Sequence, residues 1–105
     1  MQIVSDSKFI AYVGIPDIHD GTVLRVSVDC TTAEVVLEGY SGCVHTVLFN
    51  GVDEVEMNEP EGMLLYSLSE MSATPPLRSF VFTNNDEDDG KSLRILATDF
   101  RICCK

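Results

Sequence analysis

The chain has 105 residues, of which 45% are hydrophobic and 23% are charged, a composition that predicts one globular domain spanning residues 1–105. Acidic residues number 17 against 7 Lys and Arg, which gives a formal net charge of −10. Because nucleic acids and anionic lipid heads are bound through Lys and Arg, this charge excludes both as partners. The negative electrostatic field of such a chain favours a basic protein or a cation as partner. Alternatively, the charge only keeps the protein soluble.

The segment 5–15 has two interpretations. A serine cap followed by apolar residues at helical spacing predicts a short helix, through Ser5 or Ser7 and then Phe9, Ile10 and Val13. Alternating apolar residues also predict a strand, through Phe9, Ala11, Val13 and Ile15. The sequence leaves this choice open, and Pro16 ends the element in either case.

Residues 22–29 (TVLRVSVD) and 34–39 (EVVLEG) alternate between apolar and polar side chains, with a polar turn at 30–33 between them. Such alternation predicts strands with one buried and one solvated face. The inward-facing residues are expected to be Leu24, Val26 and Val28 in the first run and Val35 and Leu37 in the second. Together the two runs predict a β-hairpin.

A second break at 39–42 precedes two further apolar runs, at 43–49 and 52–57. The Asn50-Gly51 pair between them predicts a two-residue hairpin, because both residue types tolerate positive φ. Gly51 is also compatible with a bulge within one longer, bent strand.

Further strands are predicted at 63–68, at 77–83 after the extended Pro75-Pro76 segment, and at 92–103 after a polar tip at 84–91. In the last strand, Thr98-Asp99 is expected to shift the register so that Phe100 and Ile102 regain the core. The pattern predicts a mainly β protein, an antiparallel sandwich or rolled sheet of six or seven strands, with an α+β fold as the alternative. The expected core comprises Leu24, Val26, Val28, Val35, Leu37, Phe49, Val55, Leu93 and Ile95.

The tip is the segment that comes nearest to a calcium loop. Aligned on Gly90, its ligand positions are Asn85, Glu87 and Asp89, and Leu96 stands where an EF-hand has its bidentate glutamate. The pattern therefore excludes an EF-hand, and we expect a solvated hairpin tip without a metal.

Two histidines stand near other reactive groups. His19 lies between Asp17 and Asp20, but no further residue has the spacing that a zinc site with three or four ligands requires. We instead expect one of these aspartates to cap the turn that enters the 22–29 strand. Cys43 and His45 would share a strand face, which is the minimum for a nucleophilic pair, whereas a buried cysteine beside a satisfied histidine is the more common arrangement.

No motif in the chain predicts an enzyme or a cofactor: there is no Gly-rich phosphate loop, no G-x-S-x-G elbow and no Walker motif. The N-terminal residues lack the basic start and continuous apolar run of a signal peptide, and the apolar run at 9–15 is too short to span a bilayer. Four cysteines without CxxC spacing then favour reduced thiols and a cytoplasmic location: Cys30, Cys43, Cys103 and Cys104.

Two acidic clusters stand out, one between Asp53 and Glu61 and one at 86–89, and neither contains a Lys or Arg. Strand alternation predicts that Val55 and Met57 face the core, which leaves Glu54 and Glu56 together on the solvated face. We interpret the clusters as a binding surface for a basic partner protein, with Met57 and Tyr66 as candidate apolar anchors. The partner-binding candidates are Glu54, Glu56, Glu59, Glu61, Asp86, Glu87, Asp88 and Asp89.

Three pieces of the chain carry a family resemblance: 15–21 leading into TVLRVSVD, VLFNGVDEVEM at 47–57, and LRILATDFRI at 93–102. With about half of its length, the chain resembles small bacterial β-sheet proteins of the polymorphic-toxin immunity type and related uncharacterised domains. The resemblance implies a non-enzymatic protein that blocks a toxin by occupying its surface, and it carries no catalytic residue. The chain departs from the aromatic-rich middle of such families, since it has no Trp.

Overall fold

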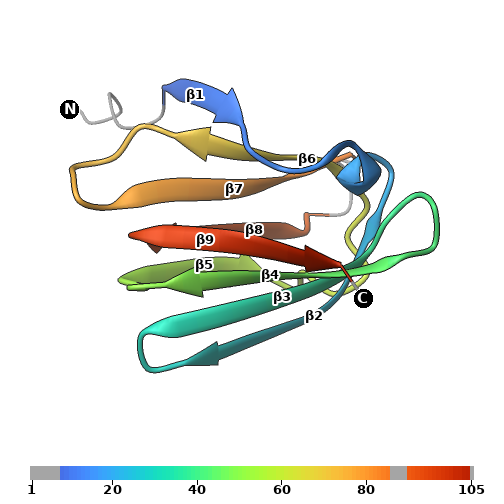
Figure 1. The fold of residues 1–105 in the computed structure, drawn as a ribbon, viewed down its shortest axis with the longest axis horizontal. Helices are drawn as coiled ribbons and strands as arrows, with labels where there is room; N and C mark the ends of the chain where they lie inside the picture. The colour runs from blue at the N-terminus through green and yellow to red at the C-terminus, as the bar shows by residue number, and fades with distance from the viewer. Residues whose placement is uncertain (1–7, 86–89, 105) are drawn as a thin grey trace.

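Two antiparallel sheets pack against each other in the computed structural model, which describes residues 8–85 and 90–104 (Figure 1). One sheet has five strands in the order β1-β6-β7-β8-β5, and the other has four in the order β2-β3-β4-β9. The strands are β1 (Phe9–Tyr12), β2 (Thr22–Asp29), β3 (Thr32–Glu38), β4 (Val44–Asn50), β5 (Glu54–Asn58), β6 (Leu65–Met71), β7 (Arg78–Asn84), β8 (Ser92–Ala97) and β9 (Asp99–Cys104). The predicted mainly β, antiparallel sandwich is confirmed, but the described part of the chain has nine strands and not the predicted six or seven, because residues 9–12 form a strand and the run at 92–103 forms two.

The N-terminal segment is a strand, because β1 pairs antiparallel with β6 at the edge of the five-stranded sheet. The helical interpretation of 9–13 is therefore wrong, while Ser5 and Ser7 lie outside the described residues. A single 3-10 turn, η2 (Pro16–Ile18), follows and buries Ile18, which is 1% exposed. This turn leads the chain from the five-stranded sheet to β2 of the other sheet.

The predicted hairpin of β2 and β3 is confirmed, but its inward-facing residues differ at two positions. A bulge between Val23 and Arg25 makes Leu24 the extra residue, so Val23 is fully buried and Leu24 is 44% exposed. Val26 pairs with buried Val35 and is partly buried. Val28 is 47% exposed, because β2 is the outermost strand of its sheet.

The chain does not turn back at Gly51, so the predicted Asn50-Gly51 hairpin is wrong. β4 and β5 belong to different sheets, and the chain bends between them at Gly51, whose φ is +63°. The amide of Thr98 donates to the carbonyl of Asn50 at 3.0 Å, and that of Asp53 donates to Leu96 at 2.8 Å. The β4–β5 connection thus runs beside the β8–β9 connection. The alternative of a bulge within one longer strand is also wrong, because β4 and β5 are separate strands of different sheets.

The predicted strand at 92–103 is two strands, because the chain crosses between sheets at Thr98. β8 pairs with β7 and β5, whereas β9 pairs with β4. The register shift expected at Thr98-Asp99 is present, and Phe100 and Ile102 pack against the core.

The core lies between the two sheets. Five of its expected members are fully buried: Val35, Leu37, Phe49, Leu93 and Ile95. Val55 is partly buried, and Met57, expected to face the core, is 52% exposed near the end of edge strand β5. Phe80 and Phe82 of β7 face Phe49 of β4, with ring centroids 5.2 and 6.0 Å from that of Phe49.

Candidate functional site

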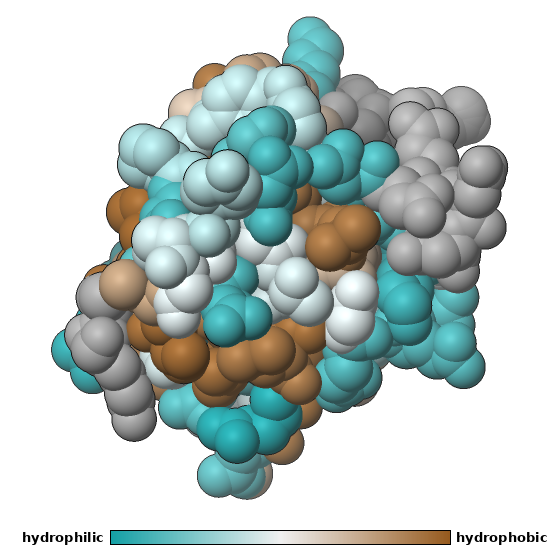
Figure 2. All heavy atoms as spheres, turned by 90° about the vertical axis from the view of Figure 1, so that its right-hand side faces the viewer, coloured by the Kyte–Doolittle hydropathy of each residue, from teal (hydrophilic) through white to brown (hydrophobic). Residues whose placement is uncertain are grey.

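Several connections meet at one end of the sandwich, on the right-hand side of Figure 1. They include η2, the turn between β3 and β4, the loop 59–64 and the two flanks of the tip, Asn85 and Gly90. Figure 2 looks onto this end, where exposed apolar side chains lie among hydrophilic ones. Both histidines, His19 and His45, lie at this end, together with two of the partner-binding candidates, Glu59 and Glu61.

Asp17 joins η2 to the β3–β4 turn. Its carboxylate accepts hydrogen bonds from the Ser41 amide (2.9 Å), the Ser41 hydroxyl (2.8 Å) and Nε2 of His45 (2.8 Å). Gly39 packs so closely against this carboxylate that a Cβ at position 39 would overlap it. The sequence predicted that Asp17 or Asp20 caps the turn that enters β2, and this is wrong for both: Asp17 caps the turn at 39–43, and Asp20 accepts a hydrogen bond from Asn85.

His45 is buried, with 4% of its surface exposed, and its Nδ1 has no hydrogen-bond partner among the described residues. Cys43 precedes β4 and is exposed, so it does not share a strand face with His45. Cys43 is therefore neither placed on the strand face of His45, as a nucleophilic pair requires, nor buried, as the structural interpretation expected. Asp17 holds the imidazole by a hydrogen bond, which connects the start of β4 to η2.

We expect the Asp17 cluster to make folding stability depend on pH in the acidic range. The hydrogen bonds from His45 and Ser41 hold the pKa of Asp17 below its ordinary value. A carboxylate with a lowered folded-state pKa stabilises the protein above the unfolded-state pKa, about 3.9, and this stabilisation is lost as the pH falls through the folded-state pKa. Urea unfolding between about pH 5 and pH 2 measures the effect.

The variant His45→Leu removes the main cause of the lowered pKa of Asp17. It should show a shallower loss of unfolding free energy with acid than the native protein. Asp29→Asn, which removes an exposed carboxylate at the other end of β2, is the control and should keep the native slope. Identical slopes in the native protein and in His45→Leu would show that this cluster does not govern acid stability.

His19 lies on the surface beside the Asp17 cluster. Its Nδ1 donates to the carbonyl of Tyr66 at 2.9 Å, and its Nε2 lies 3.6 Å from Oδ2 of Asp20. Asp20 also accepts a hydrogen bond from the side chain of Asn85 at 3.0 Å. Among the described residues, no group of three or more His, Cys, Asp and Glu side chains is placed to hold a metal ion.

The acidic candidates of β5 alternate with a partly buried valine, as the sequence predicted. Glu54 and Glu56 are exposed on the outer face of the five-stranded sheet, with Val55 between them facing the core. Glu56 accepts a hydrogen bond from Nε of its cross-strand neighbour Arg94 at 3.0 Å, and this contact lowers the pKa of Glu56. A base that is distant in the sequence therefore pairs with one of the predicted acids.

The two acidic clusters of the sequence are linked through their flanking residues. The side chain of Asn58 donates to the carbonyl of Gly90 at 2.8 Å. Nζ of Lys91 donates to the main-chain carbonyls of Glu59 and Glu61 at 3.1 and 3.2 Å. Asp86, Glu87, Asp88 and Asp89 lie outside the described residues. The loop with Glu59 and Glu61 thus lies against one flank of the tip, and Asp20 contacts the other flank; we call Asp20, Glu59 and Glu61 the acidic end.

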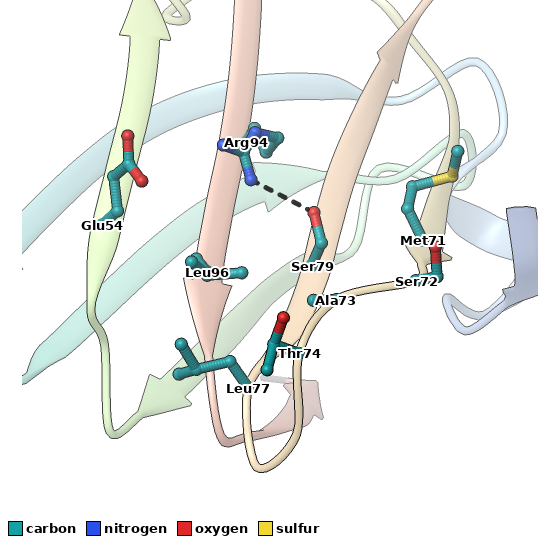
Figure 3. A pocket seen from close by; sticks show the side chains of 9 residues that line it. All are labelled: Glu54, Met71, Ser72, Ala73, Thr74, Leu77, Ser79, Arg94 and Leu96. Atoms are coloured by element: carbon teal, nitrogen blue, oxygen red, sulfur yellow. Dashed lines mark hydrogen bonds between the residues drawn. The ribbon is translucent and has the colours of Figure 1, made fainter. Parts of the chain in front are cut away.

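Glu54 also lines a hollow of about 400 Å³ on the outer face of the five-stranded sheet (Figure 3). Leu77 and Leu96 contribute apolar surface, and Nη1 of Arg94 donates to the Ser79 hydroxyl at 3.3 Å. Ser79 is 4% exposed although it lies on the outer face. The guanidinium of Arg94 is thus held by Glu56 and Ser79, at the side of the hollow.

A row of exposed rings was not predicted from the sequence, apart from Tyr66. The ring centroids of Phe9 and Tyr12 are 4.8 Å apart, those of Tyr12 and Tyr66 are 6.4 Å apart, and those of Tyr66 and His19 are 5.1 Å apart. Phe9, Tyr12 and Tyr66 are 52%, 61% and 44% exposed. The row ends at His19, beside Asp20 of the acidic end.

These features define an antiparallel two-sheet sandwich with an acidic end and an adjacent row of exposed aromatic rings. Comparisons with protein-family models, with curated proteins and with solved structures found no match for the chain. In the described part of the chain, no helix is long and apolar enough to cross a membrane.

Proposed function

We propose that this protein is a non-enzymatic interaction protein that binds a basic partner protein through its acidic end. The observation that carries the proposal is that acids from separate segments lie at the two flanks of the tip. Asp20, from the turn before β2, contacts Asn85, and Glu59 and Glu61, from the loop after β5, contact Lys91 through their main-chain carbonyls. Concentrated carboxylates raise the rate of encounter with a positively charged surface and exclude nucleic acid. The net charge of −10 acts in the same direction.

The immunity-type resemblance fits this proposal, because blocking a toxin by occupying its surface needs a complementary face and no catalytic group. The exposed free thiols of Cys30, Cys43 and Cys103 are compatible with the reducing cytoplasm in which such a protein would act. The sequence also allows a second function, a β-barrel or sandwich domain that binds a small ligand in the interior of a rolled sheet. It has less support, since Phe49, Phe80 and Phe82 occupy the space between the sheets.

We expect reversal of the acidic end to slow association with the partner that affinity capture identifies. The variant Glu59→Lys/Glu61→Lys changes two exposed acids, and at low salt its association rate constant should fall by about tenfold or more. Stopped-flow measurements at several salt concentrations test this, because screening should reduce the difference between variant and native protein.

Asp29→Lys/Asp53→Lys is the matched control, with the same change in net charge at exposed positions near the other end of the sandwich. The molecule extends 40 Å along its longest axis, several times the Debye length of about 10 Å at 0.1 M salt but close to that of about 30 Å at 0.01 M. The control is therefore compared at about 0.1 M salt, where it should retain most of the native rate. Equal rates for both variants and the native protein would reject the proposal and leave the acids as solubilising groups.

A further inference from the structure

We infer that the aromatic row lines a groove that receives an extended, arginine- or lysine-bearing segment of the basic partner. This inference rests on the proposed function and gives the acidic end the apolar anchor that affinity requires. Electrostatic attraction mainly sets the encounter rate, whereas binding energy concentrates in buried aromatic and arginine contacts. The structure places exposed rings directly beside the acidic end.

Three hollows on the surface join to form the groove. The first, of about 290 Å³, and the second, of about 250 Å³, share Tyr12 and Tyr66 as lining residues. The second and the third, of about 650 Å³, share Pro16 and His19, and the third is also lined by Asp20. These adjoining hollows, which we together call the aromatic groove, extend from the outer face of β6 to Asp20 of the acidic end.

The surroundings of the aromatic groove select a cation. Its lining contains no Lys or Arg among the described residues, and the third hollow is lined by two acidic residues, Asp17 and Asp20. A guanidinium or ammonium group is attracted to the face of a tyrosine ring, and its aliphatic stem packs on the apolar surface. Arginine fits best, because its planar group both stacks on rings and forms paired hydrogen bonds to carboxylates.

Small polar side chains also line the groove. Ser67 and Ser69 line the first hollow together with the rings, and their hydroxyl oxygens lie 3.2 Å apart. Small polar side chains leave room for a main chain to approach, while the exposed rings of Tyr12 and Tyr66 offer large contact areas at low entropic cost. An uncharged oligosaccharide also stacks on tyrosine rings, but it gains nothing from the carboxylates.

Tetra-arginine amide is the probe that tests the inference. Titrated at low salt into the full chain labelled with ¹⁵N, it should shift the backbone amides of Tyr12, Tyr66 and Asp20 most strongly. The variant Tyr12→Ala/Tyr66→Ala should weaken binding by about fivefold or more, and Tyr12→Phe/Tyr66→Phe, which keeps both rings, should retain it within about twofold. Leu24→Ala/Val28→Ala removes the same number of exposed apolar side chains from the other sheet and should bind like the native protein.

The chemical-shift changes of the native protein test the inference even if the Tyr12→Ala/Tyr66→Ala variant does not fold. Shifts confined to the loop of Glu59 and Glu61 would overturn the aromatic groove while leaving the proposed function intact. Groove shifts caused by maltotriose but not by tetra-arginine would replace the cationic segment by a carbohydrate and overturn the inference. Groove shifts by tetra-arginine, together with an unchanged association rate in Glu59→Lys/Glu61→Lys, would support the groove and reject only the role of Glu59 and Glu61.

Discussion

Truncation of Phe49 to alanine is expected to lower the free energy of unfolding by about 3–5 kcal/mol. Phe49 is fully buried on β4, and its ring lies against three others, with centroids 5.2 Å away for Phe80, 6.0 Å for Phe82 and 6.2 Å for Phe100. These rings come from both sheets, so collapse around the missing side chain would require the sheets to shift together. Urea unfolding followed by circular dichroism measures the loss.

Leu24→Ala is the control for this truncation, since it removes an apolar side chain that is 44% exposed at a bulge. Its cost should stay below about 1 kcal/mol. If Phe49→Ala does not fold, Phe49→Leu keeps much of the apolar volume and should cost about 1–2 kcal/mol. A loss for Phe49→Ala as small as that for Leu24→Ala would mean that the two sheets are not held together by this ring cluster.

The fold class could be predicted because alternation is a local property of each strand. The β2–β3 hairpin and the buried residues of β3 follow directly from it. The bulge in β2 could not be predicted in this way, since it arises from the pairing of β2 with β3 and leaves the apolar pattern of 22–29 unchanged. One inserted residue moved Leu24 to the surface and brought Val23 into the core.

The bend at Gly51 shows a similar limit. An Asn-Gly pair between two apolar runs predicts a hairpin when only neighbouring residues are considered. The deciding contacts come from Thr98, which lies 48 positions after Asn50 and donates hydrogen bonds to its carbonyl where the β8–β9 connection passes the β4–β5 connection. Long-range pairing therefore overrides a strong local turn signal.

For the candidate site, the sequence predicted which acidic residues are available but not how they are arranged in space. The alternation around Glu54 and Glu56 was sufficient to predict that both side chains are exposed. The pairing of Glu56 with Arg94, the bond between Asp17 and His45, and the contact between the rings of Tyr12 and Tyr66 each join residues 28 or more positions apart in the chain. Such contacts follow from topology and have no periodic signature.

The ion pair of Arg78 and Glu70 offers a second test of how the sandwich is held together. Two hydrogen bonds join the side chains, from Nε to Oε2 at 3.0 Å and from Nη2 to Oε1 at 2.9 Å, and they raise the pKa of Arg78. The guanidinium lies 5.1 Å from the ring centroid of Phe80 and 5.5 Å from that of Phe100. The Glu70 side chain is only 13% exposed, whereas that of Arg78 is 35% exposed.

Replacement of Arg78 by methionine is expected to lower the free energy of unfolding by about 2 kcal/mol. The methionine retains apolar contact with the rings but leaves the carboxylate of Glu70 without its partner in a largely buried place, and removal of one member of a fully buried pair costs about 3–5 kcal/mol. The expected loss is smaller because Arg78 is partly exposed, which weakens the pair. The double variant Arg78→Met/Glu70→Leu removes both charges and should recover most of the loss, since apolar replacement of a buried pair is often neutral. Urea unfolding of the native protein, both single variants and the double variant gives the coupling free energy, expected at about 1–2 kcal/mol. Additive effects of the two single changes would show that the pair contributes only through packing on Phe80 and Phe100.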